Sequence, residues 1–139
     1  MAAPQLEHLF TLTAATNMTG MIAGGPMGTR VIVDASSGTF EGPKLTGTVS
    51  GPGGDWVTAL ADGSLRLDVR ILLKTADGAD ILMEYQGRSP DGGKHITTAP
   101  FFQTGDERYT WLNNAVCVAT GGTIDGGVRY EIYQVVAES

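Results

Sequence analysis

The sequence has one cysteine and no long apolar run. Because Cys117 is the single cysteine among 139 residues, no disulfide can form within the chain. Its apolar surroundings, residues 115–119, predict a buried and unreactive thiol rather than a nucleophile. No apolar run approaches the roughly 20 residues that a membrane span needs. We therefore expect a soluble protein without a membrane partner.

Positive charge is also scarce. Nine Lys and Arg residues stand against 15 Asp and Glu residues, which gives a net charge of −6. The basic residues are scattered and form no stripe, so the phosphate-neutralising surface of a nucleic-acid-binding protein is missing. Residues 1–5 lack the basic and apolar regions of a secretory signal, which indicates a cytoplasmic location.

Histidine is also rare, and the sequence has no typical phosphate-binding loop. The only histidines, His8 and His95, lie far apart and belong to no ligand-spaced cluster. The glycine-rich segment 24–28 is not followed by a helix that would hold a phosphate. We expect no metal and no cofactor.

Glycine, in contrast, is abundant. The 20 glycines occur in clusters between short runs of alternating polar and apolar residues, and no window has helical periodicity without an intervening glycine cluster. This pattern predicts a single all-β domain over residues 1–139. A closed or nearly closed antiparallel β-barrel of about eight to ten short strands is preferred over a sandwich, because closure removes exposed strand edges. Gly47, in the centre of a predicted strand over residues 44–50, indicates a bend or a close backbone approach.

The clearest element is a β-hairpin over residues 63–88, with its turn at residues 75–78. One face of its first strand is charged and carries Arg66, Asp68 and Arg70. The other face is apolar and consists of Leu65, Leu67, Val69, Ile71 and Leu73. The alternation does not decide whether the charged face points to water or into the barrel.

Seven segments together resemble a family of bacterial and fungal proteins called domain of unknown function 3237. These segments are residues 28–30, 38–43, 54–56, 62–63, 68–70, 75–78 and 108–113. The resemblance covers roughly residues 6–136 and implies a small antiparallel β-barrel, similar in outline to allene oxide cyclase and lipocalin-like barrels, with no assigned general activity. Many members carry a longer insertion after the position of Arg88, where this chain has only a short Pro-Gly loop. If that insertion is a lid in relatives, the cavity of this chain is more open or is closed by a partner subunit.

The first candidate site is the charged face of the hairpin. If that face lines the lumen, Asp68 would accept a proton, Arg70 would anchor an enolate or a carboxylate, and Tyr85 would donate a hydrogen bond. The alternative is a solvated face or a structural ion pair, because exposed charge pairs are common.

Two further candidates are aromatic. Asp55 and Trp56 follow a Gly-Pro-Gly-Gly loop, so the ring would stack on a substrate while the carboxylate acts on it. Tyr109, Trp111 and Asn113 would share one face of an extended segment and suit an apolar pocket with one orienting amide. Core packing, with Asp55 capping a turn, explains the same residues.

We expect a cofactor-independent, homo-oligomeric enzyme that transfers protons on a small aromatic or carbonyl compound, as an isomerase, cyclase or lyase does. Asp55 or Asp68 would be the base, Arg70 the anion stabiliser and Tyr85 the donor. The substrate-binding residues would be Trp56, Tyr109, Trp111 and Asn113. The alternative is a non-catalytic binding or carrier barrel for a small apolar ligand. A third is a structural protein whose barrel is filled with side chains.

Overall fold

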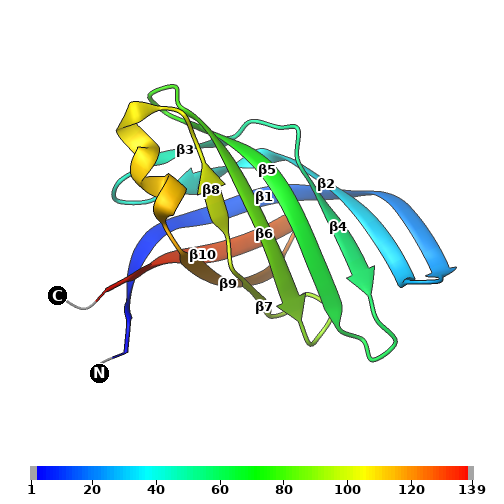
Figure 1. Ribbon diagram of the computed structural model, residues 1–139. Helices are drawn as coiled ribbons and strands as arrows, with labels where there is room; N and C mark the ends of the chain where they lie inside the picture. The colour runs from blue at the N-terminus through cyan, green and yellow to red at the C-terminus, as the bar shows by residue number, and fades with distance from the viewer. Residues whose placement is uncertain (1–2, 138–139) are drawn as a thin grey trace.

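The computed structural model describes residues 3–137, which form ten β-strands and one 3₁₀ helix (Figure 1). The elements are β1 (Gln5–Gly25), β2 (Gly28–Glu41), β3 (Thr46–Val49), β4 (Gly54–Ala59), β5 (Leu65–Thr75), β6 (Asp80–Ser89), β7 (Ile96–Thr98), β8 (Phe101–Gln103), η1 (Glu107–Asn114), β9 (Cys117–Ile124) and β10 (Gly127–Val136). In this described part of the chain, no helix has the length and apolar character needed to cross a membrane.

Eight of these described strands close into a ring. Their order around the ring is β1-β2-β4-β5-β6-β7-β9-β10, and β10 pairs again with β1. All of these pairings are antiparallel. The two remaining strands are peripheral, since β3 bridges β2 and β5 and β8 adds to β6. The predicted β-barrel is confirmed.

The hairpin of β5 and β6 shows which face of the sheet is inside. Leu67, Val69 and Ile71 are buried, whereas Asp68 and Arg70 are exposed. A small barrel has one interior, and burying apolar side chains there is favourable while burying unpaired charges is costly. The charged face of the central strand therefore points to water, which settles the orientation that the sequence left open.

One end of the barrel is filled with side chains. Phe10 lies between Phe40 and Phe102, with ring centroids 5.2 Å and 5.8 Å away. Leu73, Ile81 and Met83 pack into the same end of the core. Such close packing leaves no room for a ligand at this end.

Helix η1 covers this end, and it corrects the prediction of an extended segment at residues 109–113 (Figure 1). Asp106 caps the helix by accepting a hydrogen bond from the N–H of Arg108. A 3₁₀ helix has three residues per turn, so the buried residues are Tyr109 and Leu112. Side chains two apart, such as Tyr109 and Trp111, therefore do not share one face.

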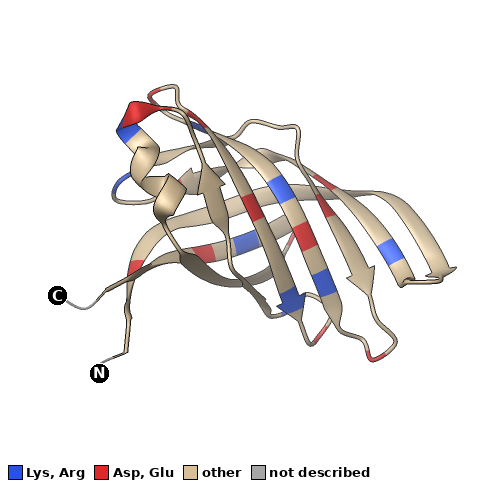
Figure 2. Cartoon of the chain, in the orientation of Figure 1, with Lys and Arg blue, Asp and Glu red and all other residues tan. Residues whose placement is uncertain are grey.

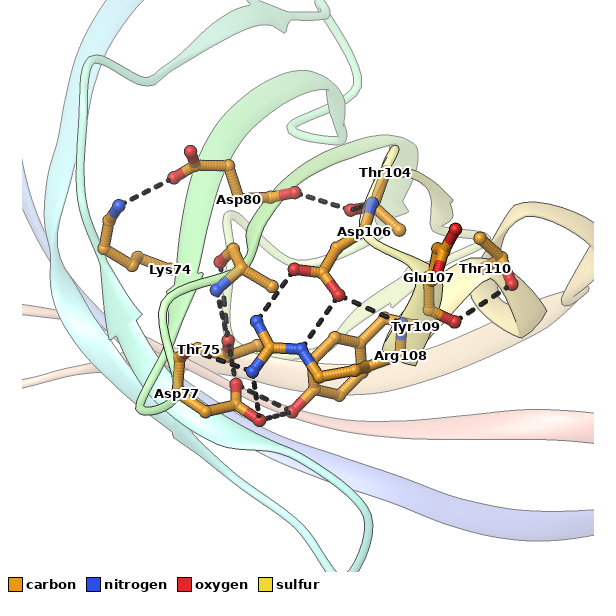
Figure 3. Close-up of polar contacts among 11 residues, drawn as sticks. Lys74, Thr75, Asp77, Asp80, Thr104, Asp106, Glu107, Arg108, Tyr109 and Thr110 are labelled. Carbon is orange, nitrogen blue, oxygen red and sulfur yellow. Dashed lines mark hydrogen bonds and ion pairs between the residues drawn. The ribbon is translucent and has the colours of Figure 1, made fainter.

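A polar network fastens η1 to the β5–β6 turn (Figure 3). The Arg108 guanidinium donates to the Asp106 carboxylate at 2.8 Å and to the backbone carbonyl of Asp77 at 3.0 Å. The Tyr109 hydroxyl donates to both carboxylate oxygens of Asp77, at 2.9 and 2.8 Å. Two of the segments that carry the family resemblance, residues 75–78 and 108–113, are thus in contact at the covered end of the barrel.

Replacing Tyr109 with Phe is expected to lower the melting temperature by about 4 °C at pH 7, because hydrogen bonds to a carboxylate are lost. Bonds from Thr75 and then Tyr109 lower the pKa of Asp77. A lowered carboxyl pKa stabilises the fold above the unfolded pKa, and that stability is lost as the pH falls, so the difference should shrink toward pH 3. Thermal unfolding at both pH values measures this, with Tyr133→Phe on β10 as the control. Equal melting temperatures at pH 7 would contradict the role of this bond.

The β1–β2 hairpin extends beyond the ring as an arm (Figure 1). Strand β1 continues to Gly25 because it goes on pairing with β2 after its pairing with β10 stops at Ala15. Several large apolar side chains of the arm are exposed, namely Met18, Met21, Ile22 and Met27. The expected homo-oligomer stays a prediction, and this arm is a surface on which to test it.

Candidate functional site

The other half of the barrel contains a cavity of about 240 Å³. Its walls are mostly aliphatic, with side chains such as Leu12, Val33, Val69 and Ile71. Thr16, Thr123 and the glycines of the loop after β6 also line it. Among the described residues that line this cavity, Asp55 is the single Asp, Glu, Lys, Arg or His. Its carboxyl group therefore dominates the chemistry of the cavity.

Two neighbouring strands and a tight loop place Asp55. It lies in β4 opposite Val33 of β2 and Val69 of β5. In the preceding loop, the Gly53 carbonyl accepts a hydrogen bond from the N–H of Ala35 at 3.0 Å. A Cβ on Gly53 would lie 2.8 Å from both the Ala35 carbonyl oxygen and Ile71 Cγ2, so only glycine fits there. The glycines of this loop thus approach protein backbone and hold the start of β4 close to its neighbours.

The environment of Asp55 favours its neutral form. Burial raises the pKa of this carboxyl from 3.8 to about 7, and the nearby Asp68 carboxylate adds a smaller increase. The backbone N–H of Asp68 donates to Asp55 Oδ1 at 3.1 Å, which lowers the pKa by less than burial raises it. A carboxyl group with a pKa near 7 holds a proton in a useful fraction of molecules at neutral pH and gives it up readily.

Two tyrosines share this cavity with Asp55. Tyr85 comes from β6 and Tyr130 from β10, and their rings meet edge to face with centroids 5.5 Å apart. Burial raises the pKa of Tyr130 to about 12. Burial also raises the pKa of Tyr85 well above its ordinary value, and the neighbouring Tyr130 adds to this increase. The Asp55 charge contributes to both increases, so the three groups act on one another. Both phenols stay protonated at neutral pH and are hydrogen-bond donors.

These three side chains form an acid/base group with neutral donors in an apolar chamber. The Asp55 carboxyl can give and accept a proton, and the two phenols can stabilise negative charge that develops on a substrate oxygen. The apolar walls strengthen such interactions because they lower the local dielectric constant. Within residues 3–137, no three His, Cys, Asp or Glu side chains are arranged to hold a metal ion.

The structure brings together only part of the predicted site. Asp55 and Tyr85 line the cavity, and their catalytic role stays a prediction. Asp68 and Arg70 lie on the outer face, where Arg70 Nε is 3.4 Å from the Glu84 carboxylate. Trp56 also lies on the outer face, with 44% of its surface exposed. Adjacent residues of a strand point to opposite faces, so Asp55 and Trp56 cannot act in the same pocket.

The predicted aromatic wall lies elsewhere. Tyr109 is bonded to Asp77 at the filled end, and Asn113 exchanges hydrogen bonds with the backbone of Thr104 at 2.8 and 3.0 Å. Trp111 is half-buried, with Lys44 Nζ 5.2 Å from its ring centroid. None of the three lines the cavity that contains Asp55. These residues stabilise the covered end of the barrel.

Sequence reasoning missed Tyr130. The alternation of the last strand places Tyr130 on the same face as Val128 and Ile132, and this face is the buried one. That signal marks Tyr130 as an interior residue, but it does not show that β10 faces β6 across the lumen. Only the closure of the ring brings Tyr130 beside Tyr85.

The fold and the cavity define a class of protein, a small antiparallel β-barrel with one ionisable carboxyl in an apolar interior. The model of the family described as "protein of unknown function (DUF3237)" matches residues 4–135. The chain belongs to this family, as its sequence motifs predicted.

One of the proteins with a similar sequence is a named enzyme. The hydroalkoxylation enzyme phnH of Penicillium herquei is 32% identical over 132 residues, which cover 95% of this chain and 84% of that protein. A UPF0311 protein of Bradyrhizobium diazoefficiens is 27% identical, over 94% of this chain and 95% of its own length.

Solved structures support the same fold. A crystal structure of an enzyme from P. herquei has a TM-score of 0.80 and 27% identity, over 97% of this chain and 96% of that one. A β-barrel-like protein from Acinetobacter baumannii has a TM-score of 0.82 and 27% identity, over 97% and 98% of the two chains. The proteins similar to this chain thus include an enzyme as well as proteins described only by family or by fold.

Proposed function

We propose that this protein is a cofactor-independent enzyme that transfers protons on a small, uncharged, hydroxyl-bearing aromatic compound inside the barrel. The observation that carries this proposal is the Asp55 carboxyl, whose pKa of about 7 makes it both an acid and a base at neutral pH. No Lys, Arg or His among the described residues lines the cavity, so an anionic substrate would find no positive partner there.

The similarity to a hydroalkoxylation enzyme suggests the reaction class. Hydroalkoxylation adds the O–H of an alcohol or phenol across a carbon–carbon double bond. Protonated Asp55 would give its proton to one alkene carbon, the substrate oxygen would bond to the other, and the proton of that oxygen would return to Asp55. Every atom of the substrate is kept, and one carboxyl serves as acid and then as base.

Tyr85 and Tyr130 have a supporting role in this scheme. Their hydroxyls would orient the substrate oxygen and donate to it while its charge changes. The aliphatic walls would hold the carbon skeleton in a conformation that brings oxygen and alkene together, which accounts for a large part of the rate of a ring closure.

The test is incubation with 2-prenylphenol, which has a phenol and a trisubstituted alkene in one molecule, in D₂O. The expected product is 2,2-dimethylchroman with one deuterium on the former alkene CH carbon, detected by NMR and mass spectrometry. Asp68→Asn should keep full turnover, because Asp68 lies outside the barrel. If 2-prenylphenol and larger alkenyl phenols bind but return unchanged and unlabelled, the protein is a carrier barrel instead.

Tyr85→Phe is expected to reduce turnover about 100-fold, because one positioned donor is lost from a water-poor site. Steady-state rates with 2-prenylphenol measure the effect, and circular dichroism confirms that the variant is folded. Tyr133→Phe, on the same barrel but outside the cavity lining, is the matched control. Equal rates for both variants would remove Tyr85 from the mechanism.

A further inference from the structure

The outer face of the barrel has a groove of about 600 Å³ in which three arginines converge. Arg30, Arg66 and Arg88 line it, together with Trp56 and Asp68. Strands β4 and β5 supply this groove and the inner cavity with alternating side chains, except that Leu67 borders both. The groove is therefore separated from Asp55 by the thickness of the sheet.

Strand register places the three arginines in one row across the sheet. Arg30 of β2 pairs with Thr58 of β4, Thr58 pairs with Arg66 of β5, and Arg66 pairs with Arg88 of β6. Figure 2 shows two positively charged positions side by side near the ends of β5 and β6. Like charges directly opposite each other on neighbouring strands destabilise a sheet. The row is thus a concentration of positive charge that the fold holds at a cost.

These arginines differ from most other cations of the protein. Five of the nine Lys and Arg residues lie within 4.0 Å of a carboxylate, namely Lys44, Arg70, Lys74, Arg108 and Arg129. Arg30, Arg66 and Arg88 have no such partner among residues 3–137, although the protein has an excess of acidic residues. Of the described carboxylates, Asp68 alone lines the groove with them. Hydrogen bonds from Ser64 account for most of the lowered pKa of Asp62, and the charge of Arg66 adds a smaller decrease.

A second observation concerns Arg30 itself. Its Nε is buried and has no hydrogen-bond acceptor among the described residues. A buried donor without an acceptor is costly and rare in folded proteins, and a bound acceptor is one way to satisfy it. The neighbouring Trp56 adds a flat apolar surface to the groove, with 44% of its surface exposed.

We propose that this groove binds a small organic oxyanion, a phosphate ester or a carboxylate, attached to a planar apolar group. The charged oxygens would lie between Arg66 and Arg88, whose guanidinium groups match oxyanion geometry, with Arg30 donating from the side. The planar group would stack on Trp56. The anion would neutralise the repulsion within the row, so binding would stabilise the fold.

Phenyl phosphate is the probe, and Trp56 is the reporter. The chain has two tryptophans, so Trp111→Phe leaves Trp56 as the sole one. Titration with phenyl phosphate should then quench the fluorescence of Trp56 and raise the melting temperature, more strongly than inorganic phosphate or phenol. Added NaCl should weaken the binding, because the contact is electrostatic.

Arg66→Gln and Arg88→Gln should each weaken phenyl phosphate binding at least 10-fold, and the double variant should show none. Without the probe, these variants should melt at the parent temperature or above it, since a repulsion has been removed, and this shows that they fold. Arg129→Gln is the matched control, because Arg129 is an exposed arginine outside the groove.

Two results would overturn the proposal. One is equal binding of phenyl phosphate to the parent and to the double variant. The other is that the probe has no effect while the arginine variants change the sedimentation coefficient, which would make the groove an interface between copies of the chain.

Discussion

Asp55→Asn is expected to stabilise the fold at pH 8 and to abolish the proposed activity. Asn has nearly the same shape as Asp, and its amide oxygen can still accept the hydrogen bond from the N–H of Asp68. The substitution therefore removes an ionisable proton and a buried charge but little packing. Such a combination of gained stability and lost activity is typical of a residue that is kept for function.

The sign of the stability effect follows from the two pKa values. In the unfolded chain the carboxyl titrates near 3.8, and in the folded protein near 7. Between these values the folded state binds more protons, so the free energy of unfolding of the parent falls as the pH rises. The amide of the Asp55→Asn variant has no such proton, so the advantage of this variant should be small at pH 4 and full at pH 8.

The expected gain at pH 8 is about 2 kcal/mol, because the full pKa difference corresponds to roughly 4 kcal/mol and partial exposure of the carboxyl screens about half of it. Urea titrations at pH 4 and pH 8, compared at equal slope, measure the gain. Asp68→Asn is the control and should shift the free energy of unfolding by less than about 0.5 kcal/mol. A loss of stability at pH 8 in Asp55→Asn would show that the carboxylate is structural.

The effect on turnover is expected to be at least about 10³-fold, since the amide can neither give nor accept the transferred proton. In the parent, turnover should fall as the pH rises above about 7, because the first step needs protonated Asp55. Initial rates with 2-prenylphenol across pH 5 to 9 measure this dependence. A rate that increases up to pH 9 would mean that the carboxylate acts as a base in the first step.

Gly47→Ala is expected to destabilise the protein by about 3 kcal/mol, which is at the upper end for added volume in a packed interior. A Cβ at this position would overlap the backbone carbonyl oxygen of Lys74 and would lie 2.8 Å from Cζ of Phe40. Phe40 is fully packed against Phe10, so its ring has no space to move. The close backbone approach that the sequence indicated at Gly47 is confirmed.

Gly105→Ala is the matched control, because a Cβ at Gly105 meets nothing within 4 Å and the residue has no positive φ. Its free energy of unfolding should stay within about 0.5 kcal/mol of the parent. Urea titration of both variants decides the matter. If Gly47→Ala were as stable as Gly105→Ala, β3 would have to move away from β5 at little cost.

Several features of the site were within reach of sequence reasoning. The alternation of β5 identified its two faces, because the period of two is a local property of a strand. Applied to β4, the same rule separates Asp55 from Trp56, and applied to β10 it groups Tyr130 with Ile132 on a buried face. The sequence also pointed to Asp55 and Tyr85 as candidate site residues, and both line the cavity.

The amino-acid sequence by itself determined an all-β barrel, its family and the two faces of its strands, because turn residues and alternation act over short distances. Only the tertiary structure decided which face is inside and which side chains meet. Closure of the ring sets Asp55, Tyr85 and Tyr130 around one cavity and aligns Arg30, Arg66 and Arg88 in one row outside. The structure also shows that residues 107–114 form a 3₁₀ helix over the filled end. Strand register and burial are non-local, so no stretch of sequence contains them.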